Sequence, residues 1–179
     1  MICNSGGAGG ADMTFENESI SSNIEVIAWS FKGHKTNSKC RKILGKDELE
    51  EGWDHVLIAN QSLKRNLYRL SSYVKDLLSR NWFQVKNSEA IFAIGTITGD
   101  FKVVNGGTGW AVQMAIDNNK RTYVFDQNKN MWFKFNYDND KFEAYEGIPK
   151  LTETFAGIGT REINENGINA IKELLKTKK

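Results

Sequence analysis

Glycine is concentrated at three places in this chain, and each place has the same setting. Each cluster ends an apolar run and precedes a segment with helical periodicity. Glycine weakens the interior of helices and strands, so such clusters mark tight turns or close approach of the backbone to another group. The repeated strand, glycine loop and helix predict an α/β fold. The clusters are Gly6, Gly7, Gly9 and Gly10; Gly106, Gly107 and Gly109; and Gly157 and Gly159.

The rest of the chain alternates between strand and helix patterns in the same way. Strands are expected over residues 1–4, 24–29, 90–94, 121–125 and 154–158. Helices are expected from the first glycine cluster through Phe15, and over about 47–60, 64–80, 108–118 and 163–175. We expect a polar loop over 32–46 and a hairpin at about 131–145. The alternation predicts a Rossmann-like three-layer domain over residues 1–179, with a mostly parallel sheet.

Composition limits which partners and which cellular compartment we expect for this protein. The net charge is only +2 in 179 residues, which gives no basic stripe, so a nucleic-acid partner is not expected. Cys3 and Cys40 are the only cysteines, and neither has metal-ligand spacing around it, so we expect no metal and a reducing cytoplasm. No apolar run approaches membrane-spanning length, which predicts a protein without a membrane partner.

The first glycine loop, SGGAGGAD, has the chemistry of an anion site. A helix that opens after glycines presents unpaired N–H groups at the positive end of its dipole, and these suit a phosphate. Asp12 is expected to cap those groups or to bind a ribose hydroxyl. A tight turn without ligand explains a single loop of this kind equally well. The expected ligand contacts here are Ser5, Gly6, Gly7, Ala8, Gly10 and Asp12.

The second and third glycine loops repeat the setting of the first. The carboxyl ends of parallel strands converge on one crevice, so all three loops are expected to face a single pocket. Thr160 is expected to cap the following helix, and Arg161 to pair with a phosphate or carboxylate, although a surface salt bridge fits Arg161 as well. The expected contacts are Gly106, Gly107, Thr108 and Gly109, then Gly159, Thr160 and Arg161.

Four segments together resemble the motif set of a known superfamily. SGGAGGADMTFE, SRNWFQV, NGGTGWAVQMA and FAGIGTRE are similar to motifs of the nucleotide-binding superfamily called SLOG. It joins the DNA-processing protein A (Smf) and the lonely-guy phosphoribohydrolases, and small members are frequent in phages and bacteria. The resemblance covers most of the chain except 127–150. In the family the FAGIGTRE-like unit comes first, whereas here it comes last, so the resemblance implies a circular permutation with adjacent termini.

The resemblance also implies what the pocket does. In lonely-guy enzymes an arginine and a glutamate serve cleavage of the N-glycosidic bond of a nucleoside monophosphate, and Arg80 matches the arginine. Gln113 stands where the glutamate belongs, and an amide cannot act as a general base. We therefore expect a protein that binds a nucleotide-derived small molecule, such as an ADP-ribose-type or cyclic nucleotide signal, without cleaving it. No cofactor is expected.

Other functions stay open at this point. A phage protein of this kind would sequester the signal and blunt host defence. The alternative is a nucleoside 5′-monophosphate phosphoribohydrolase or N-glycosidase that uses Arg80 and Asp12. DNA handling in the manner of the DNA-processing protein is a weaker third reading, because the chain is short and near neutral.

A few isolated residues have two interpretations each. Trp29 either stacks on a base or packs in the core, and Asn81 and Gln84 either contact base and ribose edges or face solvent. His34 and His55 have no carboxylate or nucleophile nearby in sequence, so we expect neither to be catalytic. The predicted hairpin has aromatic residues on both faces, and such a ribbon would be exposed on a monomer, which predicts a homo-oligomer contact. These aromatic residues are Trp132, Phe133, Phe135 and Tyr137.

Overall fold

The computed structural model, which describes residues 1–178, contains one eight-stranded sheet in the order β3-β2-β1-β8-β4-β5-β6-β7. The first six strands in this order run parallel, and the last two are antiparallel. The expected α/β class with a mostly parallel sheet is therefore confirmed. The strands are β1 (Ile2–Ser5), β2 (Glu25–Phe31), β3 (Arg41–Leu44), β4 (Ala90–Gly95), β5 (Arg121–Asp126), β6 (Met131–Asn136), β7 (Lys141–Tyr145) and β8 (Thr154–Gly159).

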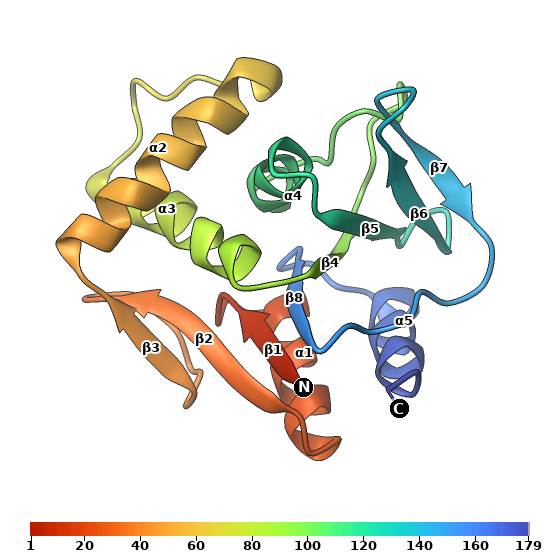
Figure 1. Cartoon of the computed structure of the whole chain (residues 1–179). Helices are drawn as coiled ribbons and strands as arrows, with labels where there is room; N and C mark the ends of the chain where they lie inside the picture. Colours follow the sequence, from red (N-terminus) through yellow and green to blue (C-terminus); the bar gives the residue numbers. More distant parts are fainter. Residues whose placement is uncertain (179) are drawn as a thin grey trace.

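Helices cover both faces of the sheet and give the three layers (Figure 1). On one face α1 (Ala11–Ser21) packs against α5 (Glu165–Leu175). On the other face α2 (Lys46–Leu63), α3 (Ser72–Lys86) and α4 (Thr108–Asp117) pack together. Strand β4 is buried along its whole length, and its alternate residues enter two separate apolar clusters, one under each helix layer. This is the burial expected of a central parallel strand.

Two elements differ from the sequence-based expectation. Strand β3 lies inside the stretch 32–46, which we expected to be a loop. It is a short edge strand whose first three residues are exposed, so it lacks the apolar run that marks a buried strand. Helix α3 begins eight residues later than expected: Lys64, with φ 51°, ends α2, and the side chain of Ser71 caps α3 by accepting from the amide of Val74.

Strand β8, the last in the chain, lies in the middle of the sheet between β1 and β4. The two chain ends lie close together at one end of the sheet (Figure 1). The carbonyl of Met1 accepts from the amide of Glu25, and Lys178 donates to the carbonyl of Ser22, three residues before Glu25. Among the described residues, no helix is long and apolar enough to cross a membrane.

Our expectation of exposed aromatic side chains on the hairpin of β6 and β7 was wrong for the three in β6, which belong to the core of this chain, whereas Tyr137 beyond β6 is 43% exposed. Strand β6 pairs with β5 and extends the sheet, and its aromatic side chains pack against other parts of the same molecule. Trp132 packs edge-on against Phe92 and Phe125, while Phe133 packs against Phe101. Trp132, Phe133 and Phe135 are at most 4% exposed. The hairpin therefore gives no argument for an oligomer.

Candidate functional site

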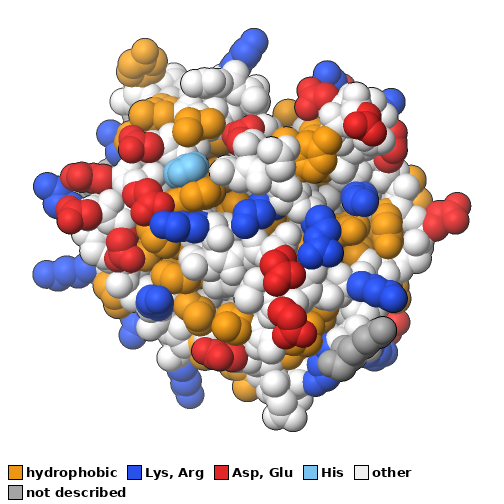
Figure 2. Space-filling view, viewed as in Figure 1, with side chains coloured by type: hydrophobic (Ala, Val, Ile, Leu, Met, Phe, Trp, Pro, Cys, Tyr) orange, Lys and Arg blue, Asp and Glu red, His pale blue; other side chains and the backbone are white. Residues whose placement is uncertain are grey.

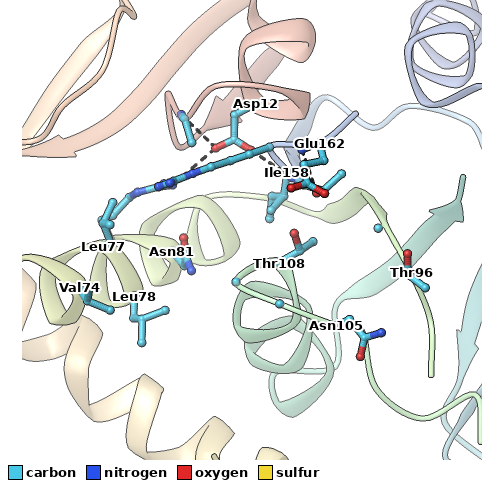
Figure 3. A pocket seen from close by; sticks show the side chains of 18 residues that line it. Asp12, Val74, Leu77, Leu78, Asn81, Thr96, Asn105, Thr108, Ile158 and Glu162 are labelled. Atoms are coloured by element: carbon cyan, nitrogen blue, oxygen red, sulfur yellow. Dashed lines mark hydrogen bonds and ion pairs between the residues drawn. The ribbon is translucent and has the colours of Figure 1, made fainter. Parts of the chain in front are cut away.

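A pocket of about 530 Å³ opens at the carboxyl ends of β8 and β4 (Figure 3). From β8 the chain continues towards α5 on one face of the sheet, and from β4 it continues towards α4 on the other face. Open α/β sheets bind their ligands at such a switch point, where neighbouring strands send the chain to opposite faces. The pocket is therefore the candidate site of this fold.

All three glycine loops contribute to the lining, together with one face of α3. Ten predicted contacts line the pocket: Ala8, Asp12, Arg80, Asn81, Gly106, Gly107, Thr108, Gly159, Thr160 and Arg161. Seven others do not: Ser5, Gly6, Gly7, Gly10, Trp29, Gln84 and Gly109.

Sequence reasoning missed the apolar wall of the pocket. Val74, Leu77, Leu78 and Asn81 all belong to α3 and line the pocket (Figure 3). Their spacing of three and four residues is a signal that the sequence offered, because it gathers side chains on one helix face. Thr96 and Asn105 line the opposite side, and Glu162 lies at the third glycine loop.

The polar groups of the first glycine loop are largely bonded within the chain. Ser5 is fully buried and donates from Oγ to Oε1 of Glu16 at 2.7 Å, and it accepts from the amide of Gly7 at 3.1 Å. The amide of Ala8 donates to Oδ2 of Asp12 at 3.4 Å. Thr36 donates to the carbonyl of Gly7 from the loop before β3. The loop is therefore a closed turn that forms one wall of the pocket.

Packing within the chain explains two glycines of this first loop, Gly6 and Gly10. A Cβ on Gly6 would lie 1.4 Å from Nη1 of Arg80. Gly10 has φ 84°, and a Cβ there would lie 2.4 Å from the carbonyl oxygen of Arg161. The backbone of the third loop thus lies directly against the start of α1, and the amide of Ala11 donates to the carbonyl of Thr160 at 2.9 Å.

The second glycine loop is open at the two glycines that line the pocket, whereas in the first loop only Gly9, outside the pocket, has open space around it. A Cβ on Gly106 or Gly107 would meet no atom within 4 Å. Gly107 has φ −61° and ψ −35°, which any residue adopts, so neither space nor backbone conformation requires glycine there. Within the described residues, the amides of Gly107 and Thr108 donate to no other group. They lie at the N-terminus of α4, where unpaired amides and the helix dipole favour an anion.

A buried arginine and aspartate form the floor between the first loop and α3. Arg80 is 5% exposed; its Nη1 donates to Oε1 of Gln84 at 2.7 Å and lies 3.8 Å from Oδ2 of Asp12. Its Nε is buried and has no hydrogen-bond partner among the described residues. Asp12 also accepts from the amide of Gly159 at 3.0 Å. Burial raises the pKa of Asp12 to about 6, although the charge of Arg80 acts in the opposite direction.

The third loop supplies the rim, and Thr160 does not cap the helix that follows it. Its Oγ1 accepts from the amide of Glu162 at 3.1 Å, because the chain makes a further turn before α5 begins at residue 165. The cap is Asn164, whose side chain accepts from the amide of Gly167. Arg161 and Glu162 are exposed at the pocket and carry opposite charges.

The remaining candidates lie outside the pocket. Trp29 is buried in the core, where its Nε1 donates to Asn4 at 2.9 Å and its ring lies against Phe83. Gln113 donates to Asp117 at 2.8 Å. The ring of His34 bonds to Ser30 and stacks on Phe31, and burial lowers its pKa to about 4.

The described residues contain no cluster of three or more side chains suited to hold a metal ion. On the face seen in Figure 2, basic and acidic side chains are interspersed without a continuous basic stripe. The fold and the pocket define a Rossmann-like α/β protein with a candidate ligand site at its switch point. A scan of protein-family models, and searches of curated proteins and of solved structures, found no match to this chain.

Proposed function

We propose that this protein binds a phosphate-bearing, nucleotide-derived small molecule in the switch-point pocket and holds it without cleaving it. The observation that carries the proposal is the second glycine loop. Among the described residues the amides of Gly107 and Thr108 have no partner, they lie at the N-terminus of α4, and both residues line the pocket, so a phosphate there would accept from these amides. The guanidinium-bearing side chain of Arg80 lines the same pocket, and its buried Nε has no hydrogen-bond partner among the described residues.

The rest of the pocket suits the nucleoside part of such a ligand. Val74, Leu77 and Leu78 form an apolar wall beside the amide side chain of Asn81 (Figure 3). Small-molecule sites combine such apolar walls with a few polar groups, in volumes of about 300–1,000 Å³. An ADP-ribose-type molecule or a cyclic nucleotide has both parts, a phosphate and an uncharged heterocycle.

The strand order supports a permuted relationship to the SLOG superfamily. If β8 is counted as the first strand and is followed by β1, β2, β4 and β5, the sheet order becomes 3-2-1-4-5. That is the order of a doubly wound dinucleotide-binding sheet. The closeness of the two chain ends fits a permutation as well (Figure 1).

Holding is favoured over cleavage by the carboxylates near the pocket. Both oxygens of Asp12 already accept backbone amides, and Gln113 lies outside the pocket. The alternative, an N-glycosidase acting on nucleoside 5′-monophosphates, is supported by one observation. Asp12 lines the pocket with a pKa near 6, which is a property of general acids.

Incubation with AMP, NAD, ADP-ribose and cyclic nucleotides, followed by chromatography, separates the two functions. We expect an unchanged ligand to be recovered from the washed and denatured protein. Gly107→Asp, whose Cβ would meet no atom within 4 Å, places a carboxylate at the anion site and is expected to abolish retention. Release of adenine that Arg80→Ala abolishes would instead establish the N-glycosidase. If neither retention nor release occurs with any of these compounds, the proposed function is wrong.

The biological role proposed for such a binder is sequestration of a signalling nucleotide in the cytoplasm. A protein that holds the signal without destroying it lowers its free concentration only in proportion to the number of its sites. A phage-encoded protein of this kind would have to accumulate to the level of the signal to act against host defence. Its abundance during infection, measured against that of the signal, tests this role.

A further inference from the structure

Arg65 lies in the linker between α2 and α3, outside the lining of the pocket, yet it contacts the second glycine loop from behind. Its Nη1 donates to the carbonyl of Gly106 at 2.6 Å, and its Nη2 donates to the carbonyl of Val104 at 3.0 Å. The guanidinium also lies over the ring of Trp110, 5.4 Å from the ring centre. One planar side chain thus joins two carbonyls of the loop to the first turns of α4.

Arg65 is itself held in place by the end of α2. Lys64 adopts a left-handed conformation that ends the helix, and the next residue folds back onto Asn60. The side chain of Asn60 accepts from the amide of Arg65 at 2.8 Å and donates to its carbonyl at 3.0 Å. Gly109 leaves the room that the contact needs, because a Cβ there would lie 2.0 Å from the carbonyl of Val104 and 2.8 Å from Nη2 of Arg65.

The contact fixes the direction of an amide in the proposed phosphate site. The C=O of Gly106 and the N–H of Gly107 belong to one planar trans peptide, so they point in opposite directions. Because the carbonyl points at Arg65, which does not line the pocket, the amide of Gly107, which does, points away from Arg65. The guanidinium also places a positive charge behind the anion site.

We propose that Arg65 is a positioning residue: it preorganises the Asn105–Thr108 loop to receive a phosphate that it does not itself contact. This proposal rests on the proposed function. It predicts that removing the guanidinium loosens the loop in the free protein and weakens binding of phosphate-bearing ligands, although no pocket-lining residue is changed.

Amide hydrogen exchange of the free protein tests the first part. The amides of Gly109 and Trp110 donate to the carbonyls of Gly106 and Gly107, both at 3.2 Å, so their exchange reports on the loop. We expect Arg65→Met to speed this exchange by about tenfold, since two charge-assisted hydrogen bonds are lost. Arg69→Met is the matched control, because Arg69 is exposed in the same linker; it should leave the exchange unchanged. Unchanged exchange in Arg65→Met would overturn the proposal.

Titration calorimetry with ADP-ribose and with inorganic pyrophosphate tests the second part. Arg65→Met should weaken both by about tenfold, and Arg65→Lys, which keeps the charge but not the two-pronged geometry, should recover only part of the loss. Faster exchange with unchanged affinity would overturn the proposal while the proposed function stands. If the wild-type protein binds neither these probes nor AMP, NAD or a cyclic nucleotide, both proposals fail, and the exchange data alone show whether the loop depends on Arg65.

Discussion

Glycine at position 107 should make the protein less stable than alanine would, while it leaves the phosphate site unobstructed. Its dihedral angles are already helical, and a methyl group would meet no atom within 4 Å. Replacing glycine by alanine at such a compatible position stabilises a protein by about 0.4–1 kcal/mol, mainly because the unfolded chain loses freedom. For a chain of this size that corresponds to a rise in Tm of about 1–4 °C. The same methyl group would lie where the phosphate approaches, so we expect affinity to fall by at least about tenfold.

Urea unfolding and titration calorimetry with ADP-ribose measure the two effects on the same protein. Gly106→Ala is the stability contrast, because its φ of 67° makes alanine costly by about 1–2 kcal/mol. Gly9→Ala is the binding contrast: a Cβ there also meets nothing, but Gly9 does not line the pocket. A destabilised Gly107→Ala would refute the claim that nothing in the chain requires glycine there. A stabilised variant that binds the ligand as well as wild type does would refute the position of the phosphate.

Three further predictions test the fold and the pocket floor. Trp132→Ala should lower the free energy of unfolding by about 3–5 kcal/mol in urea at any protein concentration, because Trp132 is a core residue of the single chain. A loss of stability that vanished on dilution would indicate an oligomer contact instead. Because the pKa of Asp12 is raised in the folded protein, this carboxyl contributes stability that is fully present below about pH 4 and is lost as pH rises through about 6. Asp12→Asn should therefore flatten the pH dependence of the free energy of unfolding in that interval. An unaltered pH profile would contradict the raised pKa. Gly10→Ala should destabilise by more than about 2 kcal/mol, measured by thermal unfolding, because it combines positive φ with a clash against the backbone of Arg161; a near-neutral effect would show that the two loops are not in contact.

The layers of the fold were predictable from sequence because buried parallel strands are nearly continuous apolar runs. Strand β4 reads Ala90 to Gly95 without a polar residue, and the glycine clusters mark where strands end and helices begin. Strand β3 escaped prediction since its residues Arg41 and Lys42 are exposed at the sheet edge, where pairing with β2 rather than apolar burial defines the strand. The burial of the aromatic side chains in β6 could not be predicted either, because the sequence does not show that β6 pairs with β5.

The pocket was predictable in outline but not in its internal roles. The rule that strand ends converge brought together residues as distant as Asp12 and Gly159, which share a hydrogen bond. The similar sequences of the first and second loops suggested equal roles, yet only the second has glycines that both line the pocket and have open space around them. What closes the first is Thr36 and Glu16, two side chains from other segments whose positions no local pattern reveals.

The difference between the two loops also decides how the pocket recognises charge. Arg80, its most buried cation, is already balanced by Asp12, and Arg161 at the rim is accompanied by Glu162. Little net side-chain charge therefore remains to attract an anion. If a phosphate binds, its affinity must come largely from backbone amides held in one direction by the start of α4 and by Arg65 behind the loop. Such a site selects by the position of the anion more than by its total charge, so a ligand with one well-placed phosphate should compete successfully with a more highly charged polyphosphate.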